Sequence, residues 1–146
     1  IPVTAAFDSL PEGSYAVRIT SEVPFVSAVR QSSGNDYAWY TPGEPLTGES
    51  IVAAPAGNDG QIALSFASLE DASSITVTPV AGGDGMTLDL DAGRSGTLVV
   101  DDRSSYRITV DGGAVVGAAG TSDDGRIGSF SIAPDPALPD PVVVTP

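Results

Sequence analysis

The sequence predicts an all-β protein, and three observations carry this prediction. Apolar residues alternate with polar or small ones along most of the chain, which is the pattern of strands with one buried face. The 17 glycines and 12 prolines are spread throughout, so no window of about 12 residues is suited to a helix. Turn-forming residues recur at the spacing of roughly 8–12 residues that is typical of β-sandwiches. Together these features favour immunoglobulin-like β-sandwich units.

Four strands are expected in the N-terminal third of the chain. In the second of them Tyr15, Val17 and Ile19 share one face, while small or polar residues occupy the other. The fourth carries three aromatic residues and follows a turn-forming Ser-Ser-Gly-Asn-Asp run. The four expected strands span residues 3–9, 14–20, 24–31 and 37–41.

Eight further strands are expected between residues 51 and 133. Glycine- and aspartate-rich turns separate them, because these residues tolerate the positive φ angles of tight turns. Such turns fall at residues 58–60, 82–85, 92–93, 111–113 and 123–125. The strands span residues 51–55, 61–68, 74–80, 86–91, 96–100, 105–111, 114–121 and 126–133. The expected core comprises Val17, Ile19, Ile75, Val77, Leu88, Leu90, Leu98, Val100, Ile108 and Val110.

Two parts of the chain resemble each other, with their matching segments in the same order. The matching segments are residues 13–20 with 104–111, 24–29 with 114–119, and 37–40 roughly with 128–131. Each part then ends in prolines around an acidic residue. The order of these matches predicts a tandem repeat of sandwich units. Tyr15 and Tyr106 begin equivalent strands, and we expect their hydroxyls to tether corners of the sandwich.

The repeat divides the chain into a half unit and a whole unit. Residues 46–135 are expected to form a complete β-sandwich domain, whereas residues 1–45 match only the C-terminal half of such a unit. Four strands bury too little surface to be stable alone, so their apolar face needs a cover. We expect upstream sequence absent from this chain to provide it, the alternatives being the second unit or another copy. Residues 136–146 are expected to form a proline-rich tail.

Composition excludes several classes of function. The net charge of −13 opposes binding to nucleic acid phosphates. The chain has no cysteine and no histidine, which excludes thiol catalysis, Ser-His-Asp hydrolases and most zinc enzymes. No motif selects a catalytic pair among the 19 acidic residues, so no catalytic or cofactor-binding residue is predicted. A fragment of a secreted hydrolase is the remotest alternative.

Aspartates in and near the turns are candidate calcium ligands, because calcium takes six or more oxygen ligands. Asp89 and Asp91 share a strand face, but the EF-hand pattern fails there because Val100 stands at its twelfth position. The alternative is that these acids are solvated and keep the sheet edges from pairing. We therefore expect no metal site.

One aromatic cluster is a candidate ligand-binding site. Tyr37, Trp39 and Tyr40 crowd one expected strand, directly after Asn35 and Asp36. By alternation Tyr37 and Trp39 share one face and Tyr40 takes the other. Exposed aromatic rings stack on sugars, and Asn35 or Asp36 could bind their hydroxyls. The competing interpretation makes Trp39 the core tryptophan of a sandwich, so its exposure decides between the two.

Several segments resemble an uncharacterised actinobacterial family of secreted, membrane-anchored β-domain proteins. They are residues 10–20 (LPEGSYAVRIT), 23–29 (VPFVSAV), 37–40 (YAWY), 105–110 (SYRITV) and 112–116 (GGAVV). The resemblance implies an extracellular or cell-envelope location, an anchor outside this chain and no known activity. The expected function is a non-catalytic extracytoplasmic β-sandwich module for scaffolding or protein interaction at the cell envelope. The alternative is a carbohydrate- or cell-wall-binding module centred on Trp39.

Overall fold

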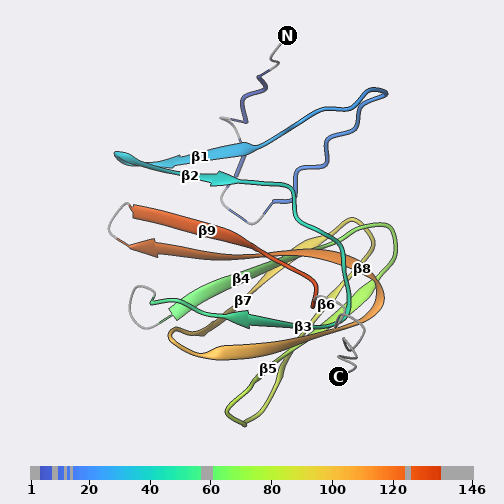
Figure 1. Ribbon diagram of the computed structural model, residues 1–146, viewed down its shortest axis with the longest axis vertical. Helices are drawn as coiled ribbons and strands as arrows, with labels where there is room; N and C mark the ends of the chain where they lie inside the picture. Colours follow the sequence, from blue (N-terminus) through green and yellow to red (C-terminus); the bar gives the residue numbers. More distant parts are fainter. Residues whose placement is uncertain are drawn as a thin grey trace, which may run out of the picture.

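The computed structural model describes residues 4–7, 10–11, 13, 15–56, 61–123 and 126–135, without the side chains of 122 and 123. In this part of the chain the structure is all-β and contains no helix (Figure 1). Its strands are β1 (Val29–Ser33), β2 (Asp36–Tyr40), β3 (Leu46–Ala53), β4 (Gln61–Ser68), β5 (Ser73–Pro79), β6 (Met86–Leu90), β7 (Ser95–Asp101), β8 (Ser105–Asp123) and β9 (Arg126–Ile132). The all-β prediction is therefore confirmed.

Strand β8 organises a sandwich-like arrangement of two antiparallel layers. Its first half pairs with β3 on one side and with β5 on the other, and β5 pairs onward with β6. Its second half pairs with β4 and β9, and β4 pairs onward with β7. Figure 1 shows β8 curving from the layer that holds β3 into the layer that holds β9. A strand that changes layers in this way forms the corner of a sandwich.

Two glycines allow β8 to bend. Gly112 has a φ of +94°, and a Cβ there would lie 2.7 Å from the carbonyl oxygen of Ala72. A Cβ on Gly113 would lie 2.8 Å from the Cβ of Asp71. Only glycine combines this φ with so close an approach of another backbone. The sequence predicted a turn here between two strands, but the chain stays paired throughout and the two expected strands form one.

Two buried serines fasten the β4–β5 turn to the bend. Ser73 Oγ donates to the carbonyl oxygen of Gly113 at 2.8 Å and lies 3.2 Å from Ser68 Oγ. Ser68 Oγ in turn donates to the carbonyl oxygen of Asp71. The Gly113 amide donates to the carbonyl oxygen of Ala72 at 3.0 Å. These bonds satisfy polar groups that burial would otherwise leave unpaired.

A single core fills the space between the two layers. Of the ten predicted core residues, six are buried and two are partly buried against them; these eight are Ile75, Val77, Leu90, Val100, Ile108, Val110, Leu88 and Leu98. The largest fully buried side chain is Phe66 on β4. Val17 and Ile19 were predicted wrongly, because they are 41% and 47% exposed.

Of the four strands expected at the N-terminal end, the fourth agrees with β2, but the first three are wrong. The described residues of 3–9 and 14–20 form no strand, and of 24–31 only the last three residues belong to β1. The sequence pattern is that of a strand, but a strand also requires a neighbour for its backbone groups. In the described part of the chain no strand pairs with residues 15–28. The turn at 58–60 and the tail at 136–146 lie outside the described residues.

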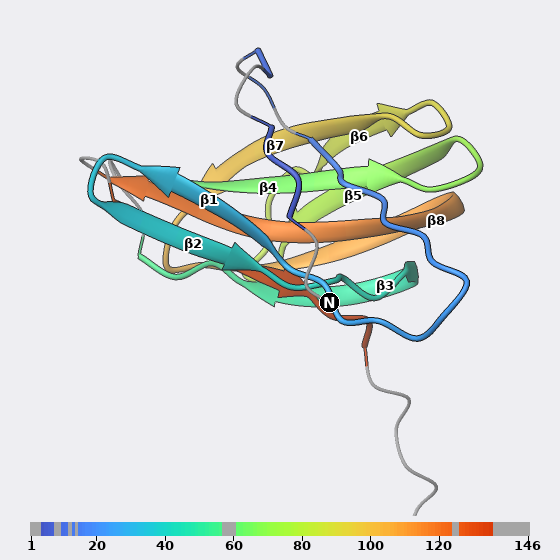
Figure 2. The same ribbon diagram turned by 90° about the horizontal axis from the view of Figure 1, so that it is seen from above.

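The β1–β2 hairpin forms a separate two-stranded sheet next to β9 (Figure 2). The Ile127 amide of β9 donates to Asp36 Oδ2 at 3.0 Å, and Ser131 Oγ donates to the carbonyl oxygen of Thr41 at 3.4 Å. Ala38, on the inner face of β2, is buried. The hairpin is thus held to the body of the molecule at both ends of β2.

Of the two tyrosines expected to tether corners of the sandwich, Tyr106 does so, whereas Tyr15 makes a similar hydrogen bond but begins no strand. The hydroxyl of Tyr106, which is buried, donates to the carbonyl oxygen of Asp101 at 3.0 Å. The hydroxyl of Tyr15, which is half exposed, donates to the carbonyl oxygen of Pro11 at 2.7 Å.

The different burial of the two tyrosines predicts different costs of removing the hydroxyl. Tyr106→Phe should lower the free energy of unfolding by about 1–2 kcal/mol, because it leaves a partly buried carbonyl without its partner. Tyr15→Phe should change it by less than ~0.5 kcal/mol, as exposed substitutions usually do. Urea unfolding followed by circular dichroism measures both. Equal losses in the two variants would contradict the assignment of Tyr106 to the core.

Candidate binding site on the β1–β2 hairpin

Tyr37 and Trp39 lie together on the outward face of the hairpin. They are 58% and 57% exposed, and Ala38 between them points to the buried side. The hairpin register places Arg30 opposite Trp39 and Ser32 opposite Tyr37. Residues directly opposite on one face have their Cβ atoms about 4.5–5.5 Å apart. The predicted shared face is therefore present, and Trp39 is not the core tryptophan of the sandwich.

Tyr40 belongs to the opposite face, as alternation predicted. It is half-buried, and its hydroxyl donates to Gln31 Oε1 at 2.6 Å across the hairpin. This bond ties β1 to β2 and leaves the Tyr40 ring on the side that faces the body of the molecule. Of the three clustered aromatic residues, only Tyr37 and Trp39 can meet a ligand from outside.

Asp36 anchors the hairpin. Its Oδ1 accepts the Tyr37 amide at 2.9 Å, and its Oδ2 accepts the Ile127 amide at 3.0 Å. The bond from Ile127, then that from Tyr37, and the charge of Arg126 hold the pKa of the Asp36 carboxyl below its usual value. The carboxylate is thus engaged with backbone groups. Asn35, exposed in the turn, is the polar neighbour of the aromatic pair that remains open to a ligand.

The lowered pKa of Asp36 predicts that acid loosens the hairpin. The ionised Asp36 carboxyl stabilises the contact between the hairpin and β9. This stabilisation is complete above the unfolded pKa of about 3.9 and is lost as the pH falls through the lower folded pKa. The Ile127 amide resonance, followed by NMR during acid titration, should shift in that window. Asp36→Asn should abolish this shift, whereas Asp89→Asn, which is remote from the hairpin, should retain it. An Ile127 resonance that stays constant down to complete titration of the carboxyl would refute the anchoring role.

Arg30 and Ser32 were not predicted from the sequence as neighbours of the aromatic pair. The signal that could have identified them is the Gly34-Asn35 turn, since a two-residue turn fixes the register of a hairpin. With that register, every residue of β1 acquires a defined partner on β2. The contact between Asp36 and Ile127 had no comparable signal, because the two residues are 91 positions apart.

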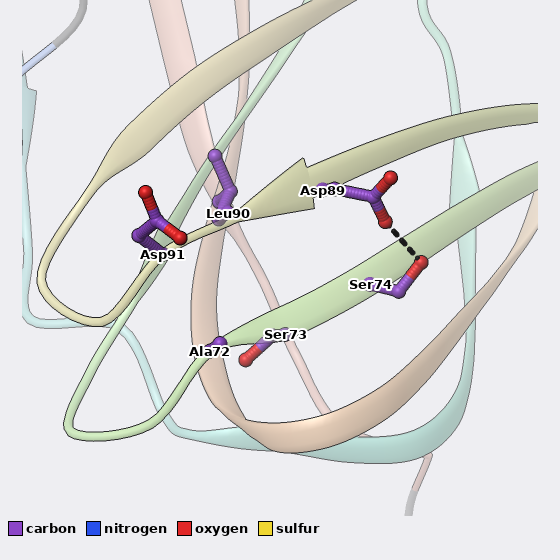
Figure 3. Close-up of a pocket in the computed structure, with 6 residues that line it drawn as sticks. All are labelled: Ala72, Ser73, Ser74, Asp89, Leu90 and Asp91. Carbon is purple, nitrogen blue, oxygen red and sulfur yellow. Dashed lines mark hydrogen bonds between the residues drawn. The ribbon is translucent and has the colours of Figure 1, made fainter.

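A hollow lies at the end of β6 and contains two of the acidic residues considered for calcium (Figure 3). Asp89 accepts a hydrogen bond from Ser74 Oγ at 2.7 Å, and Asp91 lies beyond the last residue of β6. Among the residues described, no three acidic side chains are grouped so that they could hold a metal ion. The hollow is lined by Ala72, Ser73, Ser74, Asp89, Leu90 and Asp91.

Comparison with known proteins gives a family for most of the chain. A sequence family of unknown function, DUF5719, matches residues 3–110, which include the whole β1–β2 hairpin and end within β8. No curated protein and no solved structure matches the chain. In the described ranges, no helix is long and apolar enough to cross a membrane.

Proposed function

The chain belongs to the DUF5719 family of unknown function, and we propose that it is a non-catalytic module that binds a protein partner through the outward face of the β1–β2 hairpin. The observation that carries this proposal is the exposure of Tyr37 and Trp39 side by side on a hairpin whose other face is anchored. Anchoring matters because a ligand then meets the two rings without having to order the strand that bears them.

The composition of this face suits a protein partner. Tryptophan, tyrosine and arginine are the residues that most often dominate the energetics of protein interfaces, and Trp39, Tyr37 and Arg30 present all three. Apolar surface that a partner removes from water contributes about 25 cal/mol per Å². Because Trp39 is 57% exposed, a partner that covers its side chain would remove apolar surface from water and so gain binding free energy.

We place this interaction outside the cytoplasm, at the cell envelope, where the module serves as a scaffold or contact domain. The support is the resemblance of residues 10–20, 23–29 and 37–40 to secreted, membrane-anchored β-domain proteins. Protease treatment of intact cells tests the location. An extracytoplasmic protein is digested there, whereas a cytoplasmic one is cut only after lysis.

A carbohydrate is the second candidate ligand, and the same exposed aromatic pair favours it. Sugar rings stack on such faces, and Asn35 offers a polar group beside them. The engagement of the Asp36 carboxylate with two backbone amides weakens this alternative, because it removes a strong acceptor for sugar hydroxyls. We therefore rank the protein partner first.

Trp39 is the only tryptophan in the chain, so its fluorescence reports directly on the site. A protein captured from envelope extract is purified and titrated against the wild type, Trp39→Ala, Tyr37→Ala and the control Val99→Ala, an equally exposed residue on β7. Trp39→Ala should weaken binding at least ~10-fold, as interface anchors do, and Val99→Ala should not.

Two results would contradict the proposal. One is a purified partner that binds Trp39→Ala as tightly as it binds the wild type. The other is a saturable change of Trp39 emission with neutral oligosaccharides that Tyr37→Ala removes, since this would establish the carbohydrate ligand instead.

A further inference from the structure

The β1–β2 hairpin and the β8–β9 hairpin have the same geometry. Every paired position of β1 and β2 corresponds to a paired position of β8 and β9 when 90 is added to both residue numbers. Val29 pairs with Tyr40, for example, as Ala119 pairs with Phe130. The correspondence of residues 24–29 with 114–119 thus continues through the hairpin. The strand pairing also shows that residues 37–40 correspond to 127–130, one residue earlier than the match with 128–131 expected from the sequence.

The equivalence extends to the residues before the hairpins. Tyr15 and Tyr106 stand at matching positions, and each hydroxyl reaches a carbonyl oxygen a few residues upstream. Residues 15–29 therefore correspond to residues 106–119 of β8, which include its bend. That part of β8 is paired on both sides, by β3 and β5 and then by β4. Residues 15–28 have no such neighbours within the described part of the chain.

The apolar side chains of this segment occupy positions that are buried in β8. Tyr106, Ile108, Val110 and Val115 are at most 7% exposed. The equivalent residues Tyr15, Val17, Ile19 and Phe25 are 41–50% exposed. The segment's ion pair with the body, Arg18–Glu70 at 3.1 Å, is itself exposed at both ends and holds it only weakly. A segment with the sequence pattern of a core strand thus leaves its apolar side chains exposed to solvent.

We propose that residues 15–28 dock against a partner polypeptide that supplies three strands antiparallel to them, the equivalents of β3, β4 and β5, each of which pairs with β8. Two of its strands pair with the two edges of residues 15–22, and the third pairs with the residues before β1. Its apolar residues cover Val17, Ile19 and Phe25. This surface is distinct from the Tyr37–Trp39 face, so strand docking at residues 15–28 and partner binding at the hairpin can be tested independently.

One position specifies the partner further. In β8, a Cβ on Gly117 would lie 3.1 Å from the ring of Phe66 and from Cδ1 of Ile132, so the two side chains fill the space above it. The equivalent residue in the N-terminal segment is Ser27, which has a side chain. The partner's residue at the position of Phe66 must therefore lie a few tenths of an ångström further from the docked segment than Phe66 lies from β8.

A tandem chain tests the proposal. A second copy of residues 46–103 is fused ahead of Gly13, so that it meets residue 13 as it meets Ser104 in the natural unit. Two versions are compared: the natural copy, and a copy with Ile75→Asp and Val77→Asp. The changes are made in the added copy only. Amide hydrogen exchange of residues 15–28 is measured in each version and in the original chain, with the β8 amides as an internal reference.

The natural copy should slow exchange of these amides ~10-fold or more, because a paired amide exchanges only when the pairing opens and each 1.4 kcal/mol of opening free energy is a factor of about ten. The double-aspartate copy should not protect them. The proposal is overturned if the natural copy leaves exchange unchanged or if the double-aspartate copy protects equally.

Discussion

Replacing Phe66 by alanine is expected to lower the free energy of unfolding by about 4 kcal/mol, within the range for removing a buried phenylalanine ring. Phe66 is 1% exposed and lies at the centre of β4, which pairs with both β7 and β8. Its ring packs against Gly117 of β8. The backbone cannot shift to fill the space left by the ring without breaking the hydrogen bonds of β4 to β7 and β8. The cavity should therefore stay largely unfilled.

Urea unfolding followed by circular dichroism measures this loss, and Phe25→Ala is the matched control. Phe25 is half exposed in the unpaired N-terminal segment, so its removal should change the free energy of unfolding by less than ~0.5 kcal/mol. A loss below ~1 kcal/mol for Phe66→Ala would place the ring at the surface, against the common core described above.

Replacing Gly112 by alanine should cost about 3 kcal/mol, because two effects add at the bend of β8. The φ of +94° is unfavourable for any residue with a Cβ, and the new methyl would lie 2.7 Å from a backbone oxygen of the β4–β5 turn. Since that turn is fastened by Ser68 and Ser73, it cannot retreat without breaking their buried hydrogen bonds.

Gly93→Ala separates the two effects at the bend. Gly93 has a φ of +69°, but a Cβ there would meet no atom within 4 Å. This variant should therefore lose only the conformational part, about 1 kcal/mol. If Gly93→Ala and Gly112→Ala were equally destabilised in urea, the close contact between β8 and the β4–β5 turn would be refuted.

Most strands after residue 60 could be predicted because their patterns are local, whereas β3 spans Leu46–Ala53 and only its last three residues fall within the expected strand 51–55. Period two and glycine-rich turns place β4, β5, β6, β7 and β9 to within about two residues. The pattern could not show that residues 105–111 and 114–121 join into β8. Gly112 and Gly113 indicate a turn in isolation, and only the neighbouring strands keep the chain extended through it.

The N-terminal segment shows the opposite failure. Tyr15, Val17 and Ile19 have the same alternation as the equivalent residues of β8, yet they form no strand. Propensity describes fitness for a pleated, half-buried surface and does not provide the neighbouring strand. The local sequence therefore predicted a strand in both segments. Only the segment that has neighbouring strands, β8, forms one.

At the candidate site, the sequence could predict which residues share a face but not how exposed that face is. Alternation placed Tyr37 with Trp39 and separated them from Tyr40. Exposure depends on whether another layer covers the hairpin, which is a property of the whole fold. Asp36 was considered as a ligand for sugar hydroxyls, whereas its anchoring bond joins it to Ile127, which lies in a distant part of the sequence.

The central claim, that Trp39 is an exposed contact residue, is tested most directly by acrylamide quenching of the only tryptophan in the folded chain. We expect emission and quenching close to those of a free tryptophan amide, and little change in quenching when the protein unfolds in urea. Blue-shifted emission that acrylamide quenches only after unfolding would place the indole in a core and contradict the account.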